Sequence, residues 1–224
     1  MIGVVLALAL SGQSLYAMNC ASCHGARGQG SANAPSLIGR SASDIHLMLD
    51  TGRMPASVPY LDEIHEQPRF TFPQMTAITN YVLSFDVRPD RSLPQVSGGN
   101  AVHGRALFAE NCAACHGAAG NGASVGSNDV APSLMNATVF QVAEAIRAGP
   151  GIMPRFGPDV LSDSDVDDIA RYVNAIQTKS GPAKYENTGG ANLAHTGPVA
   201  EGLVAWFFGI GALLIFVRSI GTTR

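Results

Sequence analysis

One pattern of apolar and polar positions occurs twice along the chain. Residues 12–24 align with residues 104–116, and in each copy further glycines follow. A stretch of helical periodicity comes next, at 43–51 in the first copy and at 139–148 in the second. Each copy closes with an amphipathic helix, and these two helices end in Tyr81-Val82 and Tyr172-Val173. A repeat of this length indicates two tandem copies of one small helical unit.

Two segments without periodicity follow the copies. Residues 88–100 are rich in proline and glycine, and residues 180–201 are rich in glycine, proline, asparagine and threonine. Such composition is typical of linkers rather than of regular elements. We therefore expect one domain at 12–87 and a second at 101–179.

The C-terminal part of the chain is strongly apolar. Residues 202–220 contain a single charged residue, Arg218, and as a helix they would span roughly 28 Å. This length approaches the thickness of the hydrocarbon core of a bilayer. A buried helix of a soluble protein is the alternative, but a terminal helix behind a long linker favours a membrane span. Glu201 precedes the run and Arg224 follows it, so the positive-inside rule places the C-terminus in the cytoplasm and the helical units outside.

The N-terminus is harder to interpret. Residues 2–10 are apolar but too short to span a membrane, and no lysine or arginine precedes them as in a signal peptide. The first helix of the repeat already begins near Gly12. We interpret residues 1–11 as the remnant of a longer signal or anchor segment.

Composition adds two constraints. The formal net charge is −3, so a nucleic-acid partner is not indicated. Charged residues make up only 14% of the chain, a low share that the apolar C-terminal run helps to explain.

All four cysteines lie in two Cys-x-x-Cys-His motifs, which consist of Cys20, Cys23 and His24, and of Cys112, Cys115 and His116. This motif is the signature of covalent haem attachment, in which the thiols form thioethers and the histidine becomes an iron ligand. A zinc site is the alternative, but it would leave the repeated Met-Pro loops unexplained. The sequence predicts two covalently bound haem c groups.

Each copy carries a methionine in a proline- and glycine-containing loop, at Met54 and Met153. A thioether as second axial ligand favours ferrous iron and raises the reduction potential. Methionines also fill gaps in cores, but the matched positions favour ligation. In the first copy Met48, Met75 and His46 compete for this role.

A repeated Ala-Pro-Ser-Leu tetrapeptide contains Pro35 in the first copy and Pro132 in the second. Histidines that bind metals usually donate their other ring N–H to an oxygen. We expect the carbonyls of these prolines to accept from His24 and His116; a simple loop proline is the alternative.

The order of these parts, with Thr51-Gly-Arg-Met-Pro and with Glu201-Gly-Leu-Val-Ala-Trp at the start of the span, resembles a known family. It is similar to the dihaem cytochrome c subunit of the actinobacterial type of cytochrome bcc complex, the menaquinol–cytochrome c reductase. The resemblance implies an all-α fold of two tandem class I cytochrome c domains followed by one C-terminal transmembrane helix at 202–220. It also implies the axial pairs His24/Met54 and His116/Met153.

The same resemblance implies partners and a place of action. Such a subunit sits with a cytochrome b subunit and a Rieske iron–sulfur subunit in the plasma membrane of a bacterium, with its haem domains on the outer face. It relays electrons from the Rieske centre to a terminal cytochrome c oxidase, often within a supercomplex, and is not catalytic alone. Two alternatives stay open: a tethered dihaem carrier of another respiratory dehydrogenase or oxidase, and a haem enzyme such as a dihaem peroxidase, which would need an open iron position.

Overall fold

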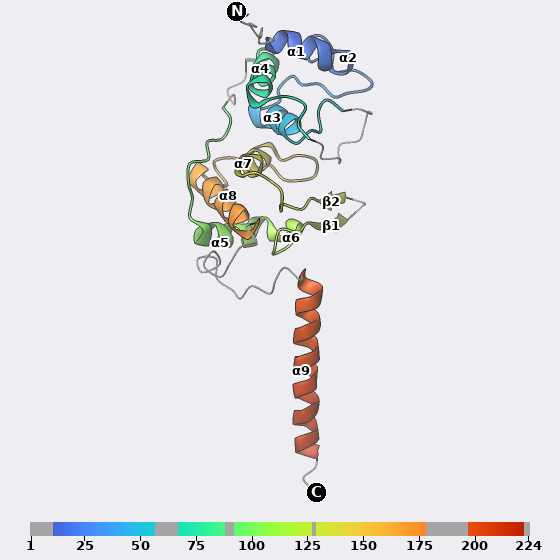
Figure 1. Ribbon diagram of the computed structural model, residues 1–224, viewed down its shortest axis with the longest axis vertical. Helices are drawn as coiled ribbons and strands as arrows, with labels where there is room; N and C mark the ends of the chain where they lie inside the picture. The colour runs from blue at the N-terminus through green and yellow to red at the C-terminus, as the bar shows by residue number, and fades with distance from the viewer. Residues whose placement is uncertain (1–10, 57–66, 88–91, 127–128, 178–196, 222–224) are drawn as a thin grey trace, which may run out of the picture. The chain divides into compact units, whose positions relative to one another are not determined.

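The computed structural model describes residues 11–56, 67–87, 92–126, 129–177 and 197–221, and for 197–201 and 221 it describes the backbone alone. The chain divides into two compact units, the first ending at Gln177 and the second beginning at Thr178. Both copies of the repeat belong to the first unit, and the apolar C-terminal run belongs to the second. Figure 1 shows that helices are the main elements of both.

Within the described residues, each copy of the repeat contains four helices in the same order. The first repeat consists of α1 (Gly12–Asn19), α2 (Ala21–His24), α3 (Ala42–Asp50) and α4 (Phe72–Leu83). The second repeat consists of α5 (Ala101–Asn111), α6 (Ala113–His116), α7 (Val139–Ala148) and α8 (Asp163–Gln177), with strands β1 (Ala123–Gly126) and β2 (Asp129–Ala131) after α6. The helical stretches predicted at 43–51 and 139–148 correspond to α3 and α7 to within one residue.

Capping boxes start the helices that the repeat predicts. Ser41 accepts a hydrogen bond from the backbone N–H of Asp44, whose carboxylate accepts from the backbone of Ser41 in return. Thr138 and Gln141 make the same exchange at the start of α7. Each exchange satisfies backbone donors that a helix start would otherwise leave unpaired. The start points of α3 and α7 are therefore encoded locally.

The first and last helices of each repeat cross at a glycine. A Cβ at Gly12 would overlap the carbonyl of Ala77 in α4, and a Cβ at Gly104 would overlap the carbonyl of Asp168 in α8. Glycine is the residue that allows two backbones to approach this closely. These matched glycines bring α1 onto α4 and α5 onto α8, and the ends of α1 and α5 carry the two Cys-x-x-Cys-His motifs.

A pair of aromatic rings stabilises each crossing. The ring centroids of Tyr16 and Tyr81 lie 5.5 Å apart in the first repeat, and those of Phe108 and Tyr172 lie 5.2 Å apart in the second. Tyr16 and Phe108 occupy the same position of the repeat and are each 1% exposed. Each repeat has its own core of buried apolar residues around its pair.

A small antiparallel hairpin distinguishes the second repeat from the predicted all-helical fold. Strands β1 and β2 pair Ala123 with Ala131 and Ser124 with Val130. In the first repeat the same place holds only an isolated bridge between Ser31 and Ala34. The reason is loop length, because the histidine and the aligned proline are 11 residues apart in the first repeat and 16 apart in the second. The additional residues extend the bridge into a hairpin.

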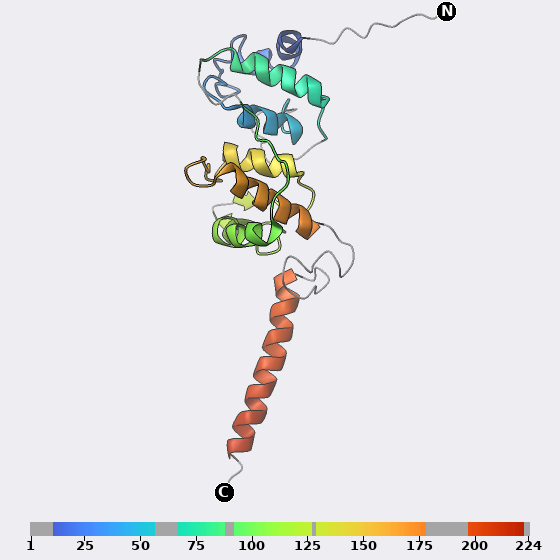
Figure 2. The ribbon, with the colours of Figure 1, turned by 90° about the vertical axis from the view of Figure 1, so that its left-hand side faces the viewer.

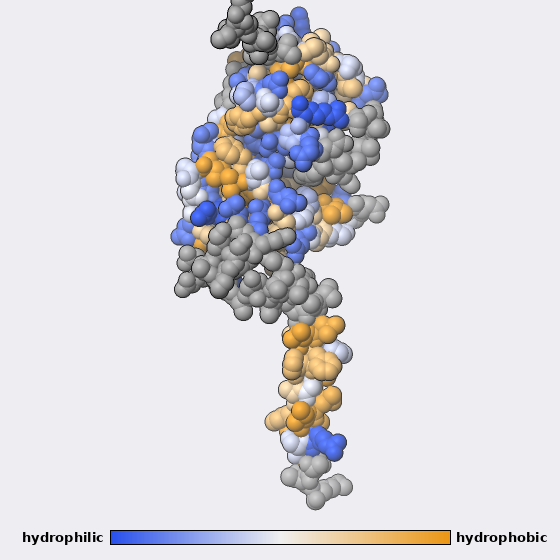
Figure 3. All heavy atoms as spheres, viewed as in Figure 1, coloured by the Kyte–Doolittle hydropathy of each residue, from blue (hydrophilic) through white to orange (hydrophobic). Residues whose placement is uncertain are grey.

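The second unit contains one long helix, α9 (Gly197–Gly221). Its window Gly202–Ile220 is long and apolar enough to cross a membrane, and none of that window is buried. Apolar side chains cover most of the face of the helix that Figure 3 shows. The predicted span at 202–220 thus coincides with the candidate span of the structure.

Several predicted boundaries fall wholly or partly outside the described residues. Of the expected N-terminal remnant, 1–11, only Ser11 is described, and the expected linkers 88–100 and 180–201 are described in part. The domain limits 12–87 and 101–179 therefore stay predictions.

Candidate haem-attachment sites

Each Cys-x-x-Cys-His motif is built on a break between two helices. Helix α1 ends at Asn19; the next residue, Cys20, has a φ of −124° that departs from helical geometry, and the single turn α2 follows. Cys112 makes the same break between α5 and α6, with φ −120°. The two cysteines of each motif differ in their exposure to solvent. Cys20 is half-buried and Cys112 buried, whereas Cys23 and Cys115 are exposed.

The histidine of each motif is buried and oriented by a backbone carbonyl. Nδ1 of His24 lies 2.8 Å from the carbonyl oxygen of Pro35, and Nδ1 of His116 lies 3.0 Å from that of Pro132. A carbonyl can only accept, so Nδ1 carries the proton in each pair. The lone pair of Nε2 is then available to bind a metal.

Two glycines that the sequence analysis did not single out hold each proline over its histidine. Gly30 and Gly122 stand six residues after the two histidines, and each donates its N–H to the histidine's own carbonyl at 2.8 Å. Their φ values are +83° and +80°, and a Cβ at either would lie 2.8 Å from the backbone nitrogen of Ser36 or Ser133. Only glycine fits such a position. The signal was present in the sequence, because these glycines align in the repeat.

The first cysteine of each motif ionises less readily than a free thiol. Burial raises the pKa of the thiols of Cys20 and Cys112 to about 11 each. A zinc site needs deprotonated cysteines whose sulfurs converge with other donors. In the described part of the chain, the one group of three converging His, Cys, Asp or Glu donors lies elsewhere, at His103, Asp165 and Asp168. The geometry of the motifs thus does not support the zinc alternative.

The predicted methionine ligands lie in loops that pack on the cores. Met54 and Met153 are half-buried, and each touches the apolar core of its own repeat. Their backbone N–H groups donate to the carbonyls of Met48 and Pro150, at 2.9 and 3.0 Å. These contacts fix the two loops, and the assignment of the methionines as iron ligands stays a proposal.

Two of the three competing ligands in the first repeat are buried in other surroundings. Met75 is 3% exposed and belongs to the apolar core of its repeat. His46 is 1% exposed and lies 2.7 Å from Glu144 of the second repeat. Met48 is half-buried on α3. Burial in these surroundings makes Met75 and His46 weaker candidates than Met54.

The residues present fit a covalently attached haem. Each motif has two cysteines and a buried histidine whose ring is held in one orientation. Each repeat also exposes an isoleucine in one of its loops. Ile38, next to the Ala-Pro-Ser-Leu segment, is 46% exposed, and Ile152, next to Met153, is 63% exposed. A large apolar ring system would remove such side chains from water, which is favourable.

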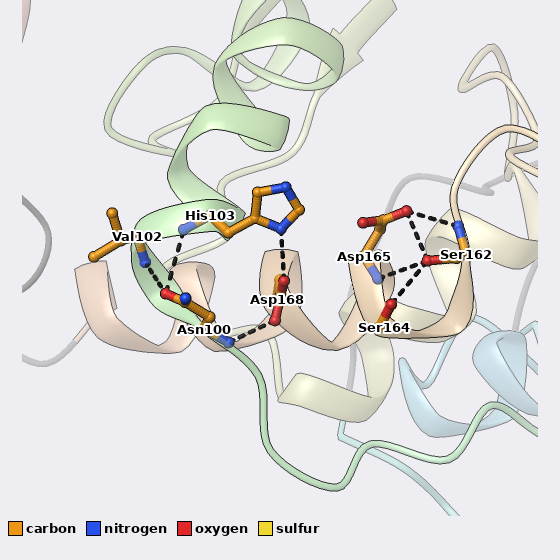
Figure 4. A network of polar contacts seen from close by, with 7 residues as sticks. All are labelled: Asn100, Val102, His103, Ser162, Ser164, Asp165 and Asp168. Atoms are coloured by element: carbon orange, nitrogen blue, oxygen red, sulfur yellow. Dashed lines mark hydrogen bonds and ion pairs between the residues drawn. The ribbon is translucent and has the colours of Figure 1, made fainter.

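The group at His103 has a structural explanation. Nδ1 of His103 lies 2.7 Å from Asp168, which also accepts from the backbone N–H of Asn100 (Figure 4). Asp165 exchanges hydrogen bonds with Ser162 at the start of α8. These contacts cap α5 and α8 and join one to the other. His103 is 53% exposed, and we assign no metal to this surface group.

Family models match both repeats. The model described as cytochrome c matches residues 9–86, and the model described as cytochrome c oxidase, cbb3-type, subunit III matches residues 99–173. Together they confirm two cytochrome c domains. The two matches also agree with the two covalently attached haems that the motifs predict.

Curated relatives extend the similarity over the whole chain. The cytochrome bc1 complex cytochrome c subunit of Mycobacterium bovis is 35% identical over 96% of this chain and 78% of its own length. The subunit of the same name from Corynebacterium efficiens is 32% identical, over 96% of this chain and 77% of its own. A cbb3-type cytochrome c oxidase subunit CcoP from an Azospirillum species is 29% identical over 74% of this chain and 61% of its own.

The resemblance to the actinobacterial subunit is thereby confirmed, and with it the expected cofactor. Both actinobacterial relatives exceed 30% identity across nearly all of this chain. Two cytochrome c domains with Cys20/Cys23 and Cys112/Cys115 bind two haem c groups covalently. The chain belongs to the family of cytochrome c subunits of the cytochrome bc1 complex, and is a dihaem electron carrier of that complex.

Proposed function

We propose that this chain receives electrons from the Rieske iron–sulfur subunit of its complex and passes them through its two haems to a terminal cytochrome c oxidase. A cytochrome b subunit would complete the quinol-oxidising complex. The observation that carries the proposal is the repetition of one complete site: each repeat has an attachment motif, a carbonyl-oriented histidine and a methionine loop.

The residues of each site have separable tasks. The cysteines would attach the haem, and His24 with Met54 and His116 with Met153 would hold the two irons. The carbonyls of Pro35 and Pro132 hold the imidazoles in one tautomer and one orientation. A haem held in this way supplies one-electron chemistry without an open position for substrate. The arrangement therefore favours a relay over a haem enzyme such as a peroxidase.

The membrane helix sets where the relay works. With α9 as a single span, Arg218 near its C-terminal end favours a cytoplasmic C-terminus and haem domains on the outer face of the plasma membrane. Electrons would then travel between membrane complexes without a soluble carrier. The similarity of the second repeat to cbb3-type oxidase subunits favours one second candidate, a tethered dihaem carrier within an oxidase.

Purification of the chain from its native membranes, through an affinity tag at the C-terminus, tests the proposal. We expect a cytochrome b, a Rieske protein and a terminal oxidase to co-purify, and both haems to become reduced when quinol is added. An inhibitor that blocks quinol oxidation should abolish this reduction. Co-purification with oxidase subunits alone would favour the second candidate. Rapid binding of carbon monoxide to a ferrous haem would contradict a closed relay site.

A further inference from the structure

The two repeats meet through their central helices. Helices α3 and α7 pack against each other, and they lie side by side in both Figure 1 and Figure 2. His46 of α3 faces Glu144 of α7, with Nδ1 and Oε1 2.7 Å apart. The side chains are 1% and 0% exposed. A titratable pair without access to water thus lies in the contact between the two haem-attaching repeats.

His46 and Glu144 are each other's nearest polar partner in a buried environment. The 2.7 Å contact is not aligned well enough for a full hydrogen bond, and Nε2 and Oε2 have no hydrogen-bond partner among the described residues. The ring of Phe72, at the start of α4, stands edge-on to the ring of His46, 5.3 Å between centroids. Separating two such groups while they stay buried would be costly, because neither would regain a polar partner.

Burial and a neighbouring acid both act on the carboxyl of Glu144. Burial raises the pKa of the Glu144 carboxyl above its usual value, and the nearby Asp50 acts in the same direction, while His46 opposes both. A protonated carboxyl can donate to Nδ1 of a neutral imidazole. The contact thus joins two buried titratable groups from different repeats at 2.7 Å.

A second polar contact joins the same two helices. The side-chain amide of Gln141 in α7 donates to the carbonyl of Asp50 at the end of α3, at 3.2 Å. Apolar helix faces tolerate sliding, whereas a buried polar pair is satisfied in one register only. The contacts of His46 and Gln141 therefore define a single alignment of α3 against α7.

We infer that His46 and Glu144 are positioning residues for electron transfer between the two haems, because their buried contact fixes the repeats that hold the haems in one relative arrangement. This inference rests on the relay proposed above. Electron exchange falls steeply with the separation of the two centres, so an alignment fixed at the junction of the repeats fixes the rate of exchange.

Three variants of the full chain with both haems attached, purified in detergent, test the inference. Glu144→Ala removes the contact. Glu144→Gln retains it, because a side-chain amide can donate to Nδ1 through its NH2 group or accept from it through its oxygen. Thr79→Val is the matched control, since Thr79 is also buried, at 2% exposed, and its hydroxyl also has no partner in the described part of the chain, but it lies within the first repeat.

Two measurements apply to each variant: the distribution of distances between the two ferric haems, by pulsed electron paramagnetic resonance, and the rate of electron redistribution after a light pulse that reduces one haem. For Glu144→Ala we expect a broadened distribution and a several-fold lower rate, because electron exchange falls steeply with the separation of the two haems. We expect Glu144→Gln and Thr79→Val to match the unmodified chain. The optical spectra of both haems should be unchanged throughout.

Equal distances and rates in Glu144→Ala and the unmodified chain would overturn the inference. If Glu144→Ala does not fold, the double variant His46→Leu/Glu144→Leu decides, because an apolar pair removes the unpaired buried group. A folded double variant with an unbroadened distribution and an unchanged rate would also overturn it. An unmodified chain that passes no electron between its haems contradicts the relay itself, whereas equal rates in all variants contradict only the role of the pair.

Discussion

At the scale of single residues, the second axial ligand decides what kind of redox centre each repeat holds. The histidines are oriented in the same way in both repeats, through Nδ1 contacts of 2.8 and 3.0 Å. A difference in ligation between the haems would therefore arise on the methionine side. Met54 and Met153 are matched in the repeat and half-buried at their own cores.

Replacement of Met54 by histidine tests its role directly. We expect the midpoint potential of one haem to fall by on the order of 0.1 V, within the range of about 0.8 V that axial ligands set, because imidazole favours ferric iron more than a thioether does. A redox titration followed by optical spectroscopy measures the change. The potential of the other haem should stay the same.

Met75→Leu is the control for this substitution. Met75 is a buried core residue of the same repeat, so its loss perturbs packing and leaves ligation intact. Both potentials should then match those of the unmodified chain. An unchanged potential in Met54→His would remove Met54 from the ligand set.

At the scale of elements, the contact between α5 and α8 includes a titratable side chain. Asp168 of α8 accepts from the imidazole of His103 and from the backbone of Asn100. The hydrogen bond to Asp168, with smaller contributions from nearby acids, raises the pKa of His103 above 6.5. The folded second repeat thus binds this proton more tightly than the unfolded chain does.

The sign of the resulting pH dependence follows from linkage. The contribution of His103 to stability is complete below about pH 6.5 and is lost as the pH rises through the raised pKa of the folded state. We expect the advantage in melting temperature of the unmodified chain over His103→Gln to decline from about pH 6 to about pH 8, where histidine titrates. Thermal unfolding monitored by circular dichroism measures it, and Asp168→Asn should abolish the decline. A difference that is constant with pH would refute the linkage.

The elements that were predicted well are those determined by residues within or next to the element itself. Helical periodicity placed α3 and α7 to within a residue, and the structure adds that Ser41 and Thr138 cap these helix starts locally. The hairpin of β1 and β2 was missed because strands of four and three residues carry too little alternation to recognise. The hairpin results from the longer loop of the second repeat, and this difference in length is seen only when the loops that end at Pro35 and Pro132 are compared.

At the scale of the whole molecule, the long-range contacts escaped prediction. His46 entered the sequence analysis only as a rival iron ligand, and Glu144 did not enter it at all. They are far apart in the chain and belong to different repeats, so no local pattern connects them. The candidate haem residues could be predicted from the sequence, because each lies in a motif that occurs twice.

The division of the molecule into two units predicts a separable anchor. A chain that ends after Gln177 should keep both haems and be released into the aqueous fraction, because it lacks the apolar window Gly202–Ile220. Carbonate extraction of membranes and haem staining of both fractions measure this. The full chain should remain in the pellet. A truncated chain that also remains there would assign membrane attachment to the first unit.

The break between α5 and α6 bears on how the protein is made. Cys112 is 8% exposed and is packed in the core of its repeat, and the pKa of its thiol is about 11. Thiols add to other groups mainly as thiolates, so a folded repeat would offer this sulfur neither access nor reactivity. Attachment has to come first, on a chain still open between α5 and α8. The second repeat would then fold around a thioether bond already made.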